Sequence, residues 1–244
     1  MISSKENPKF KGWLKLKQKK FRKLEQLFLV EGEHLVTEAV KANLVVDVLL
    51  CEGVDFDYEG SVTYLSKPLF EKLASTITSA GMMAVCRVEE KEIVAHERLL
   101  LVDGVQDPGN LGTLIRSALA FSFDGVVVSE TTVDIYNDKV VRATQGAMFH
   151  LPIKIANLGH YIFGLHKIGV DVYGAHLNTD AEKMEEIPIS KSMAFVVGNE
   201  GAGISTAILE ACTGSVMIAM SDAVESLNVG VAGSILMQKF NGIK

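Results

Sequence analysis

The sequence predicts an α/β protein whose main sheet is mostly parallel and carries helices on both faces. Short apolar runs of strand length alternate along the chain with segments whose apolar residues recur at helical spacing. Beyond residue 98 the apolar runs become richer in β-branched residues, and glycine becomes more frequent. Repeated alternation of this kind is typical of parallel strands joined by crossover helices, which bury both faces of the sheet.

Residues 1–95 contain enough alternation to form a small α/β domain of their own. The apolar spacing predicts helices at Phe10–Lys23, His34–Ala42 and Lys67–Ala74, and strands at Val45–Leu50, Val62–Leu65 and Met82–Val88. The next segment, Glu89–Arg98, is charged and poor in apolar residues, so we interpret it as a linker. We therefore predict two domains, residues 1–95 and residues 96–244.

Residues 96–244 continue the alternation over a longer stretch of chain. Strands are predicted at Leu99–Val102, Gly125–Ser129, Ile153–Ala156, Val170–Gly174, Ala194–Val197 and Val216–Met220. Helices are predicted at Leu111–Phe121, Asp138–Thr144, Leu158–Ile168, Ile204–Ala211 and Leu227–Phe240.

The last predicted helix has an unusual body, because it contains Gly230 and Gly233. Each glycine costs about 1 kcal/mol relative to alanine inside a helix. This cost indicates that something approaches the helix backbone closely. The alternative is a face of small residues packed on a sheet. We expect Ser226 to be the N-cap, since its hydroxyl can accept from the free amides of the first turn.

The charge of the chain is unevenly distributed. Nine basic residues and one acidic residue give residues 1–23 a net charge of +8, which leaves −14 for the rest of a chain whose total is −6. A basic arm on an acidic body favours a polyanionic partner that is contacted at one end. The alternative is an ordinary solvated helix face. The candidate contacts are Lys15, Lys17, Lys19, Lys20, Arg22 and Lys23.

The composition also argues against several classes of protein. Cys51, Cys86 and Cys212 are far apart and form no CxxC pair, which argues against a disulfide framework and suits a reducing compartment. No group of histidine, cysteine or carboxylate residues has metal-ligand spacing, so we expect no metal. No apolar run approaches the roughly 18 residues of a membrane helix, and the N-terminus lacks a secretory signal. We expect a cytoplasmic protein.

Three polar or glycine-rich loops follow three of the predicted strands, in residues 103–116, 198–203 and 221–226. In open α/β sheets, ligands bind beyond the carboxyl ends of the strands. The sequence therefore predicts a small-molecule site at one edge of the sheet. The absence of GxGxxG and Walker patterns argues against an ordinary nucleotide-binding enzyme. From the pattern alone, Asn110 could also be a helix N-cap and Arg116 a surface residue.

Three segments, DPGNLGTLIRSA, FVVGNEGAGIS and IAMSDAVESLNVGVA, closely resemble the three motifs of the SpoU/TrmH family of RNA ribose 2′-O-methyltransferases. This family belongs to the SPOUT superfamily, and the order and separation of the segments match it over residues of about 98–243. The segment FRKLEQLFLVEGEHLVTEAV resembles the family's N-terminal substrate-binding domain, whose fold is like that of the ribosomal protein L30e.

The resemblance implies a C-terminal trefoil knot whose loops bind S-adenosylmethionine. By position, the cofactor contacts would be Gly198, Ile218 and Leu227. The catalytic set would be Asn110, Arg116, Glu200, Ser226 and Asn228. Arg116 would stabilise the developing charge on the ribose oxygen, because a guanidinium is a poor base. Many relatives carry serine where this chain has Gly230, which leaves details of the last loop open.

The resemblance also implies the partners of the chain. They would be RNA, with ribosomal RNA favoured over transfer RNA, and a second copy of the chain in a homodimer. The segment RATQGAMF, residues 142–149, also resembles a family stretch and would be structural or would face RNA. The alternative function is an RNA-binding or assembly protein that keeps the fold but has lost catalysis.

Overall fold

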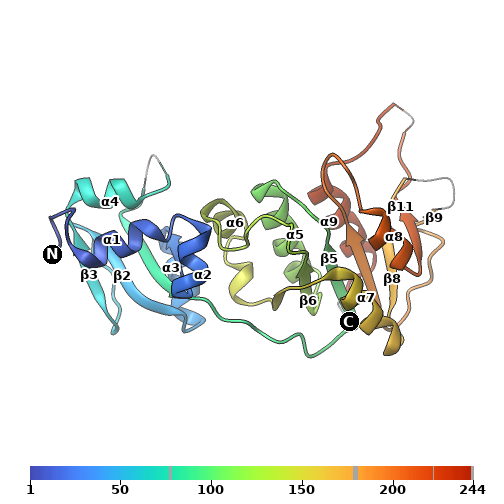
Figure 1. The fold of residues 1–244 in the computed structure, drawn as a ribbon, viewed down its shortest axis with the longest axis horizontal. Coiled ribbons are helices and arrows are strands. Elements are labelled where there is room, and N and C mark those ends of the chain that lie inside the picture. The colour runs from blue at the N-terminus through green and yellow to red at the C-terminus, as the bar shows by residue number, and fades with distance from the viewer. Residues whose placement is uncertain (77–78, 178–180, 222, 243–244) are drawn as a thin grey trace. The chain divides into compact units, whose positions relative to one another are not determined.

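The computed structural model describes residues 1–76, 79–177, 181–221 and 223–242 (Figure 1). The chain divides into two compact units, which are residues 1–89 with 134–149 and residues 90–133 with 150–244. Segment 134–149, which the predicted domain limits place in the second domain, therefore packs within the first unit.

The first unit contains a four-stranded sheet in the order β1-β4-β2-β3. The strands are β1 (Leu27–Glu31), β2 (Val45–Cys51), β3 (Val62–Leu65) and β4 (Met82–Arg87). Strand β4 is antiparallel to β1 and β2, whereas β3 is parallel to β2. The helices are α1 (Pro8–Lys15), α2 (Lys19–Glu25), α3 (Glu33–Lys41), α4 (Lys67–Leu73) and α6 (Asp138–Ala143). The single helix predicted at Phe10–Lys23 was wrong, because an extended Gln18 separates α1 from α2.

Both faces of this sheet are covered, and successive residues of β4 pack alternately on one face and on the other. Met83 and Val85 pack with α1 and α4 in one apolar cluster, which includes Trp13 and Phe70. Met82, Ala84 and Cys86 pack with α3 in another cluster, which also includes Val141 and Phe149 from segment 134–149. Segment 134–149 therefore completes the core of the first unit.

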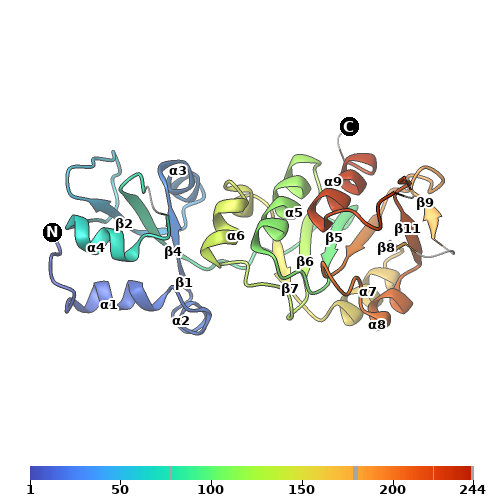
Figure 2. The same ribbon diagram turned by 90° about the horizontal axis from the view of Figure 1, so that it is seen from above.

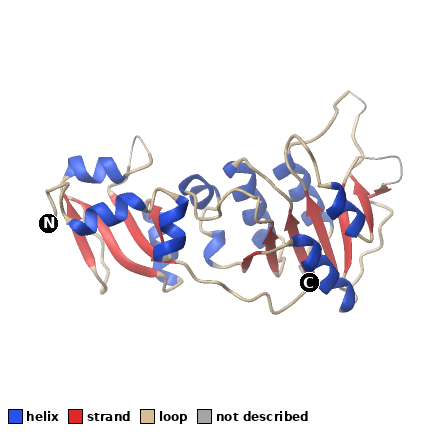
Figure 3. Cartoon of the chain, in the orientation of Figure 1, coloured by secondary structure: helices blue, strands red, loops and turns tan. Residues whose placement is uncertain are grey.

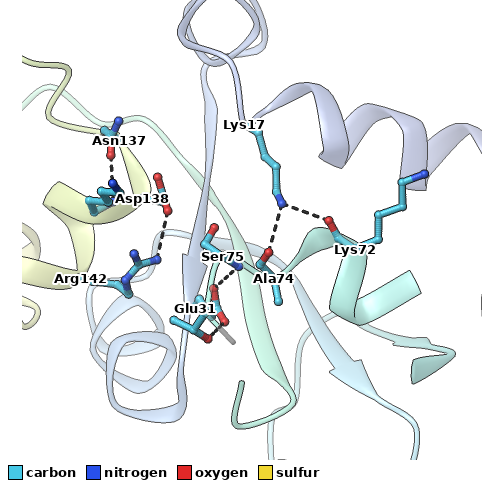
Figure 4. A network of polar contacts seen from close by, with 10 residues as sticks. Lys17, Glu31, Lys72, Ala74, Ser75, Asn137, Asp138 and Arg142 are labelled. Atoms are coloured by element: carbon cyan, nitrogen blue, oxygen red, sulfur yellow. Dashed lines mark hydrogen bonds and ion pairs between the residues drawn. The ribbon is translucent and has the colours of Figure 1, made fainter. Parts of the chain in front are cut away.

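A buried ion pair ties the same segment to the basic arm. Arg22 is 7% exposed, and its Nε lies 3.0 Å from Oδ2 of Asp134. Its Nη1 donates to the carbonyl of Leu16 at 2.8 Å. Also in the first unit, Arg142 pairs with Asp138, and Glu31 accepts from the backbone amide of Ser75 (Figure 4).

The second unit contains a parallel sheet in the order β7-β6-β5-β10-β8-β11-β9, which confirms the predicted fold class (Figure 3). The strands are β5 (Arg98–Val102), β6 (Gly125–Val128), β7 (Ile153–Ile155), β8 (Asp171–Ala175), β9 (Glu182–Lys183), β10 (Met193–Val197) and β11 (Gly214–Met217). The helices are α5 (Pro108–Ala120), α7 (Leu158–Lys167), α8 (Thr206–Ala211) and α9 (Val229–Lys239). Figure 2 shows α5 and α9 on one side of the sheet and α7 and α8 on the other. The knot stays a prediction.

The packing around helix α9 explains why it contains Gly230 and Gly233. A Cβ added at Gly233 would lie 2.3 Å from Cδ2 of Leu114, and one added at Gly230 would lie 3.4 Å from Cβ of Thr113. The element that approaches most closely is therefore helix α5, and the sheet also contacts this helix, because Val197 of β10 would lie 3.5 Å from a Cβ at Gly233. The predicted N-cap was wrong, because Asn228, not Ser226, caps the helix through Oδ1, which accepts from the amides of Gly230 and Val231.

Among the described residues, no helix is long and apolar enough to cross a membrane.

Candidate active site

A cavity of about 520 Å³ lies at the carboxyl ends of β8, β10 and β11 in the second unit. Its walls come from residues 175–177, 197–203, 216–218 and 226–229, together with Met220 and Ala232. These segments include the second and third of the predicted loops. The cavity therefore lies where an open parallel sheet places its ligands.

The loop after β10 owes its shape to its own backbone. Asn199 and Gly203 exchange two backbone hydrogen bonds of 2.9 Å each, and Gly203 has a φ of +71°. A Cβ at Gly198 would lie 2.2 Å from the backbone carbon of Gly203 and 2.2 Å from the nitrogen of Ile204. Since those neighbours are backbone atoms, any side chain at residue 198 displaces the loop. Gly198 is needed for closure of the loop, and it also lines the cavity.

Asn199 organises the same loop, although it is not among the predicted site residues. Its Oδ1 accepts from the amides of Gly201 and Ala202 at 2.9 Å each, and its Nδ2 donates to the carbonyl of Gly104 at 2.9 Å. Asp103 makes a second link, because its Oδ2 accepts from the amide and hydroxyl of Ser205. An asparagine before a glycine-rich turn is typical of a side chain that mimics a backbone turn, and this pattern could have identified Asn199.

Glu200 reaches from the second loop to the first and accepts three hydrogen bonds there. Its Oε1 accepts from the backbone amide of Asp107 at 2.9 Å and from Nδ2 of Asn110 at 3.0 Å. Its Oε2 accepts from the amide of Gln106 at 3.1 Å. Burial alone would raise the pKa of this carboxyl, but the hydrogen bonds from Asn110, Gln106 and Asp107 outweigh burial and lower the pKa below its ordinary value. Glu200 is therefore a carboxylate at neutral pH and a poor proton acceptor.

Asn110 continues this chain of hydrogen bonds into the third loop. The N-cap of α5 is Asp107, whose Oδ1 accepts from the backbone amide of Asn110 at 2.9 Å. The side chain of Asn110 is therefore not used for capping, and its Oδ1 accepts from Nδ2 of Asn228 at 2.9 Å. The series Glu200–Asn110–Asn228 joins the three motif loops and ends at the N-terminus of α9.

The predicted residues differ in where the fold places them. Gly198, Ile218 and Leu227 line the cavity together with Glu200, Ser226 and Asn228. Neither Asn110 nor Arg116 is part of the cavity wall. Arg116 is exposed on α5, and its side chain has no hydrogen bond or ion pair with any described residue. The fold thus brings Asn110, Glu200 and Asn228 together and leaves Arg116 outside this group.

The basic arm lies in the first unit and is less uniform than its sequence. Lys15, Lys19, Lys20 and Lys23 are exposed, and the ammonium groups of Lys15 and Lys20 lie 5.5 and 6.0 Å from the centre of the Phe21 ring. Lys17 is also exposed, and its Nζ donates to the carbonyls of Lys72 and Ala74 at 3.1 and 3.2 Å (Figure 4). Arg22 is the exception, because its buried guanidinium is paired with Asp134.

Comparisons with known proteins cover both units. Residues 97–238 match the model of the SpoU rRNA Methylase family, and residues 7–84 match the MRM3-like substrate binding domain. The 23S rRNA (guanosine(2553)-2′-O)-methyltransferase RlmP of Bacillus subtilis (strain 168) is 41% identical over 246 residues, which cover 99% of each chain.

Solved structures agree over nearly the full length. A putative RNA methyltransferase of the TrmH family from Porphyromonas gingivalis is 30% identical with a TM-score of 0.87, and the match covers 99% of this chain and 98% of that one. An AdoMet-bound rRNA methyltransferase from Sinorhizobium meliloti is 25% identical with a TM-score of 0.88, covering 98% and 96% of the two chains.

The parallel sheet and the cavity lined by the second and third motif loops define a methyltransferase domain of the class that uses S-adenosylmethionine. The first unit adds a substrate-binding domain. The chain belongs to the SpoU rRNA methylase family. This confirms the prediction of an RNA 2′-O-methyltransferase over the inactive alternative.

The cavity fits the cofactor that the family uses. Its volume of about 520 Å³ is within the range of roughly 300–1,000 Å³ that small-molecule sites occupy. Ile218 and Leu227 offer apolar walls for an adenosyl group, and Ser226 and Asn228 offer polar side chains. Among the described residues, no group of three histidine, cysteine or acidic side chains is placed to hold a metal ion.

Proposed function

We propose that this chain methylates a ribose 2′-hydroxyl of 23S ribosomal RNA. The observation that carries the proposal is the series Glu200–Asn110–Asn228, which links the first motif loop to the two motif loops that line the cavity. The full-length similarity to RlmP, which is named as a 23S rRNA 2′-O-methyltransferase, supports ribosomal RNA as the substrate.

S-adenosylmethionine would supply a methyl group for transfer to the ribose oxygen, with S-adenosylhomocysteine as the leaving group and release of the hydroxyl proton. The chain must hold the two reactants in line and accommodate the charge that develops on the oxygen. Gly198, Ile218 and Leu227 would hold the cofactor, and Ser226 and Asn228 would orient the reacting groups. Glu200 would not remove the proton, because its oxygens already accept three hydrogen bonds. We assign it to positioning Asn110.

Arg116 would act on the substrate side of the reaction. Its guanidinium is exposed and unpaired among the described residues, so it is available to a bound RNA. A planar cation of this kind can stabilise a developing alkoxide and bind the neighbouring phosphate. By analogy with the family, we infer a homodimer with its sites near the subunit interface and a cytoplasmic location.

The first unit would bind the RNA substrate through the exposed lysines of the arm, whose charge attracts phosphates. We restrict these contacts to five side chains, because Arg22 is buried and already paired. They are Lys15, Lys17, Lys19, Lys20 and Lys23.

The test is a map of 2′-O-methylation in RNA from cells with and without this protein. We expect one ribose of 23S rRNA to lose its methyl group, and the purified protein with S-adenosylmethionine to restore it on the unmethylated RNA. Maps that are identical for 23S rRNA, or restoration on transfer RNA alone, would contradict the proposed substrate. Sedimentation of the purified protein checks the dimer separately.

A further inference from the structure

His176 contributes to the cavity from the end of β8. It follows Ala175, the last residue of that strand, and its backbone amide donates to the carbonyl of Val216 on β11 at 3.1 Å. The backbone of His176 is therefore fixed between two neighbouring strands, and the residue lines the cavity.

The ring nitrogen Nδ1 of His176 is buried and has no hydrogen-bond partner among the described residues. Buried polar atoms nearly always have a partner, because an unpaired one loses its bonds to water without replacement. Two side-chain atoms of the described residues are in this condition, Oγ of Ser79 and Nδ1 of His176. Of these two residues, only His176 lines the cavity.

His176 also differs in polarity from the residues beside it in the cavity wall. The wall residues from the ends of β8 and β11 are otherwise apolar, namely Ala175, Leu177, Val216, Met217, Ile218 and Met220. Without His176, side chains here would offer a polar ligand no hydrogen bond. An imidazole nitrogen can donate or accept according to its tautomer, so it suits either kind of polar ligand atom.

We propose that Nδ1 of His176 forms a hydrogen bond to bound S-adenosylmethionine. The inference rests on the assignment of this cavity to the cofactor. It adds to the three motifs a cofactor-binding residue that lies outside all of them. His176 is assigned a binding role, and it takes no part in methyl transfer itself.

The test measures affinity for S-adenosylhomocysteine by calorimetry in the full-length protein and its variants. We expect His176→Leu to lower the affinity about tenfold, as the loss of one well-placed hydrogen bond does. His176→Asn places a polar atom near the position of Nδ1 and should recover most of the affinity, whereas His176→Gln reaches the position of Nε2 and should not. The matched control is His160→Leu, on the exposed surface of α7, which should bind normally.

A second measurement separates binding from folding. His176→Leu removes an unpaired polar atom, so the melting temperature of the free protein should be unchanged or higher. In the wild-type protein, the ¹⁵N resonance of Nδ1 should shift when S-adenosylhomocysteine is added, which needs no variant. Methylthioadenosine, which lacks the amino-acid part, tells which end of the ligand is bound. A smaller effect of His176→Leu on this ligand would assign the bond to the amino-acid end, and an equal effect would assign it to the adenosyl end.

Two failures are distinguishable. If the wild-type protein does not bind S-adenosylhomocysteine, the cofactor assignment of the cavity is wrong, and this inference is wrong with it. If the wild-type protein binds but His176→Leu binds equally well and the Nδ1 resonance does not move, only the role of His176 is refuted. In that case water in the cavity satisfies the ring nitrogen.

Discussion

Replacing Glu200 with glutamine tests whether the carboxylate holds the first motif loop in place. Both carboxylate oxygens accept from donors, Oε1 from Asp107 and Asn110 and Oε2 from Gln106. A glutamine side chain keeps one oxygen and gains an NH₂ group. Whichever way the amide turns, at least one donor of the loop then faces another donor, and the charge that strengthened all three bonds is lost.

The size of the effect follows from the exposure of the site. A hydrogen bond to a charged group contributes about 1.5–3 kcal/mol where water is excluded. Glu200 is exposed, so water replaces part of what the variant loses. We therefore expect Glu200→Gln to lower the free energy of unfolding by about 1–2 kcal/mol, which corresponds to roughly 2–8 °C in melting temperature for a chain of this size. Turnover should fall about tenfold, because Asn110 loses the charged acceptor that fixes its amide.

The pH dependence of stability gives a further check on the role of Glu200. The pKa of Glu200 is lowered in the folded protein, so its contribution to stability is present above the ordinary pKa of 4.5 and is lost as the pH falls through the folded value. The difference in stability between the wild type and Glu200→Gln should therefore be full at neutral pH and vanish in acid.

The assays are thermal unfolding, single-turnover methyl transfer and hydrogen exchange of the amides of Gln106 and Asp107, which should exchange faster in the variant. Glu210→Gln, an exposed substitution on α8, is the matched control. Unchanged exchange at both amides together with a normal rate would refute the positioning role of Glu200. A normal fold with complete loss of activity would instead point to a direct role in the reaction.

Three further predictions concern the cofactor, the acceptor and the RNA. Arg116→Ala should lower single-turnover methyl transfer by about 10²–10³ without changing cofactor affinity, and Arg116→Lys should recover little of the rate; a near-normal rate would exclude a catalytic role. Gly198→Ala should weaken S-adenosylhomocysteine binding in calorimetry because its Cβ displaces the loop, and full affinity would contradict this packing. When glutamine replaces the five exposed lysines of the arm, a filter-binding salt titration should show a weaker dependence of RNA affinity on salt. An equal slope would mean that these lysines are only a solvated surface. They are Lys15, Lys17, Lys19, Lys20 and Lys23.

The sequence predicted the buried strands of the second unit well, because their burial leaves a pattern in the residues themselves. Met193–Val197 is apolar at every position, as a central parallel strand must be. β1 escaped prediction although Leu27, Phe28, Leu29 and Val30 form the same kind of apolar run. Only Gln26 separates β1 from helix α2, so no polar loop marks where the strand begins. β9, Glu182–Lys183, is exposed and has no apolar signal, and it forms only by pairing with β11.

The candidate site residues were predicted through resemblance to motifs, and the sequence alone could not give their partners. Asn110 bonds to Glu200 across 90 positions and to Asn228 across 118, and no local pattern specifies contacts at such separations. The glycines of α9 also show that a local pattern does not identify a distant partner. Their cost indicated a close approach, but the sequence could not tell that the approaching element is helix α5.

Arg22 shows why a run of basic residues is an incomplete guide to a binding surface. In the sequence it is one of several cations in the arm, yet in the fold it is buried against Asp134, 112 positions away. Removing one partner of a buried ion pair costs about 3–5 kcal/mol, since the other charge is left unpaired. The same bond holds segment 134–149 to the first unit, where Val141 and Phe149 enter the core. A substitution of Arg22 would therefore destabilise the substrate-binding unit as a whole. Weakened RNA binding in such a variant would not be evidence of a contact between Arg22 and a phosphate. Only variants that keep Arg22 can separate the electrostatic role of the arm from its structural one.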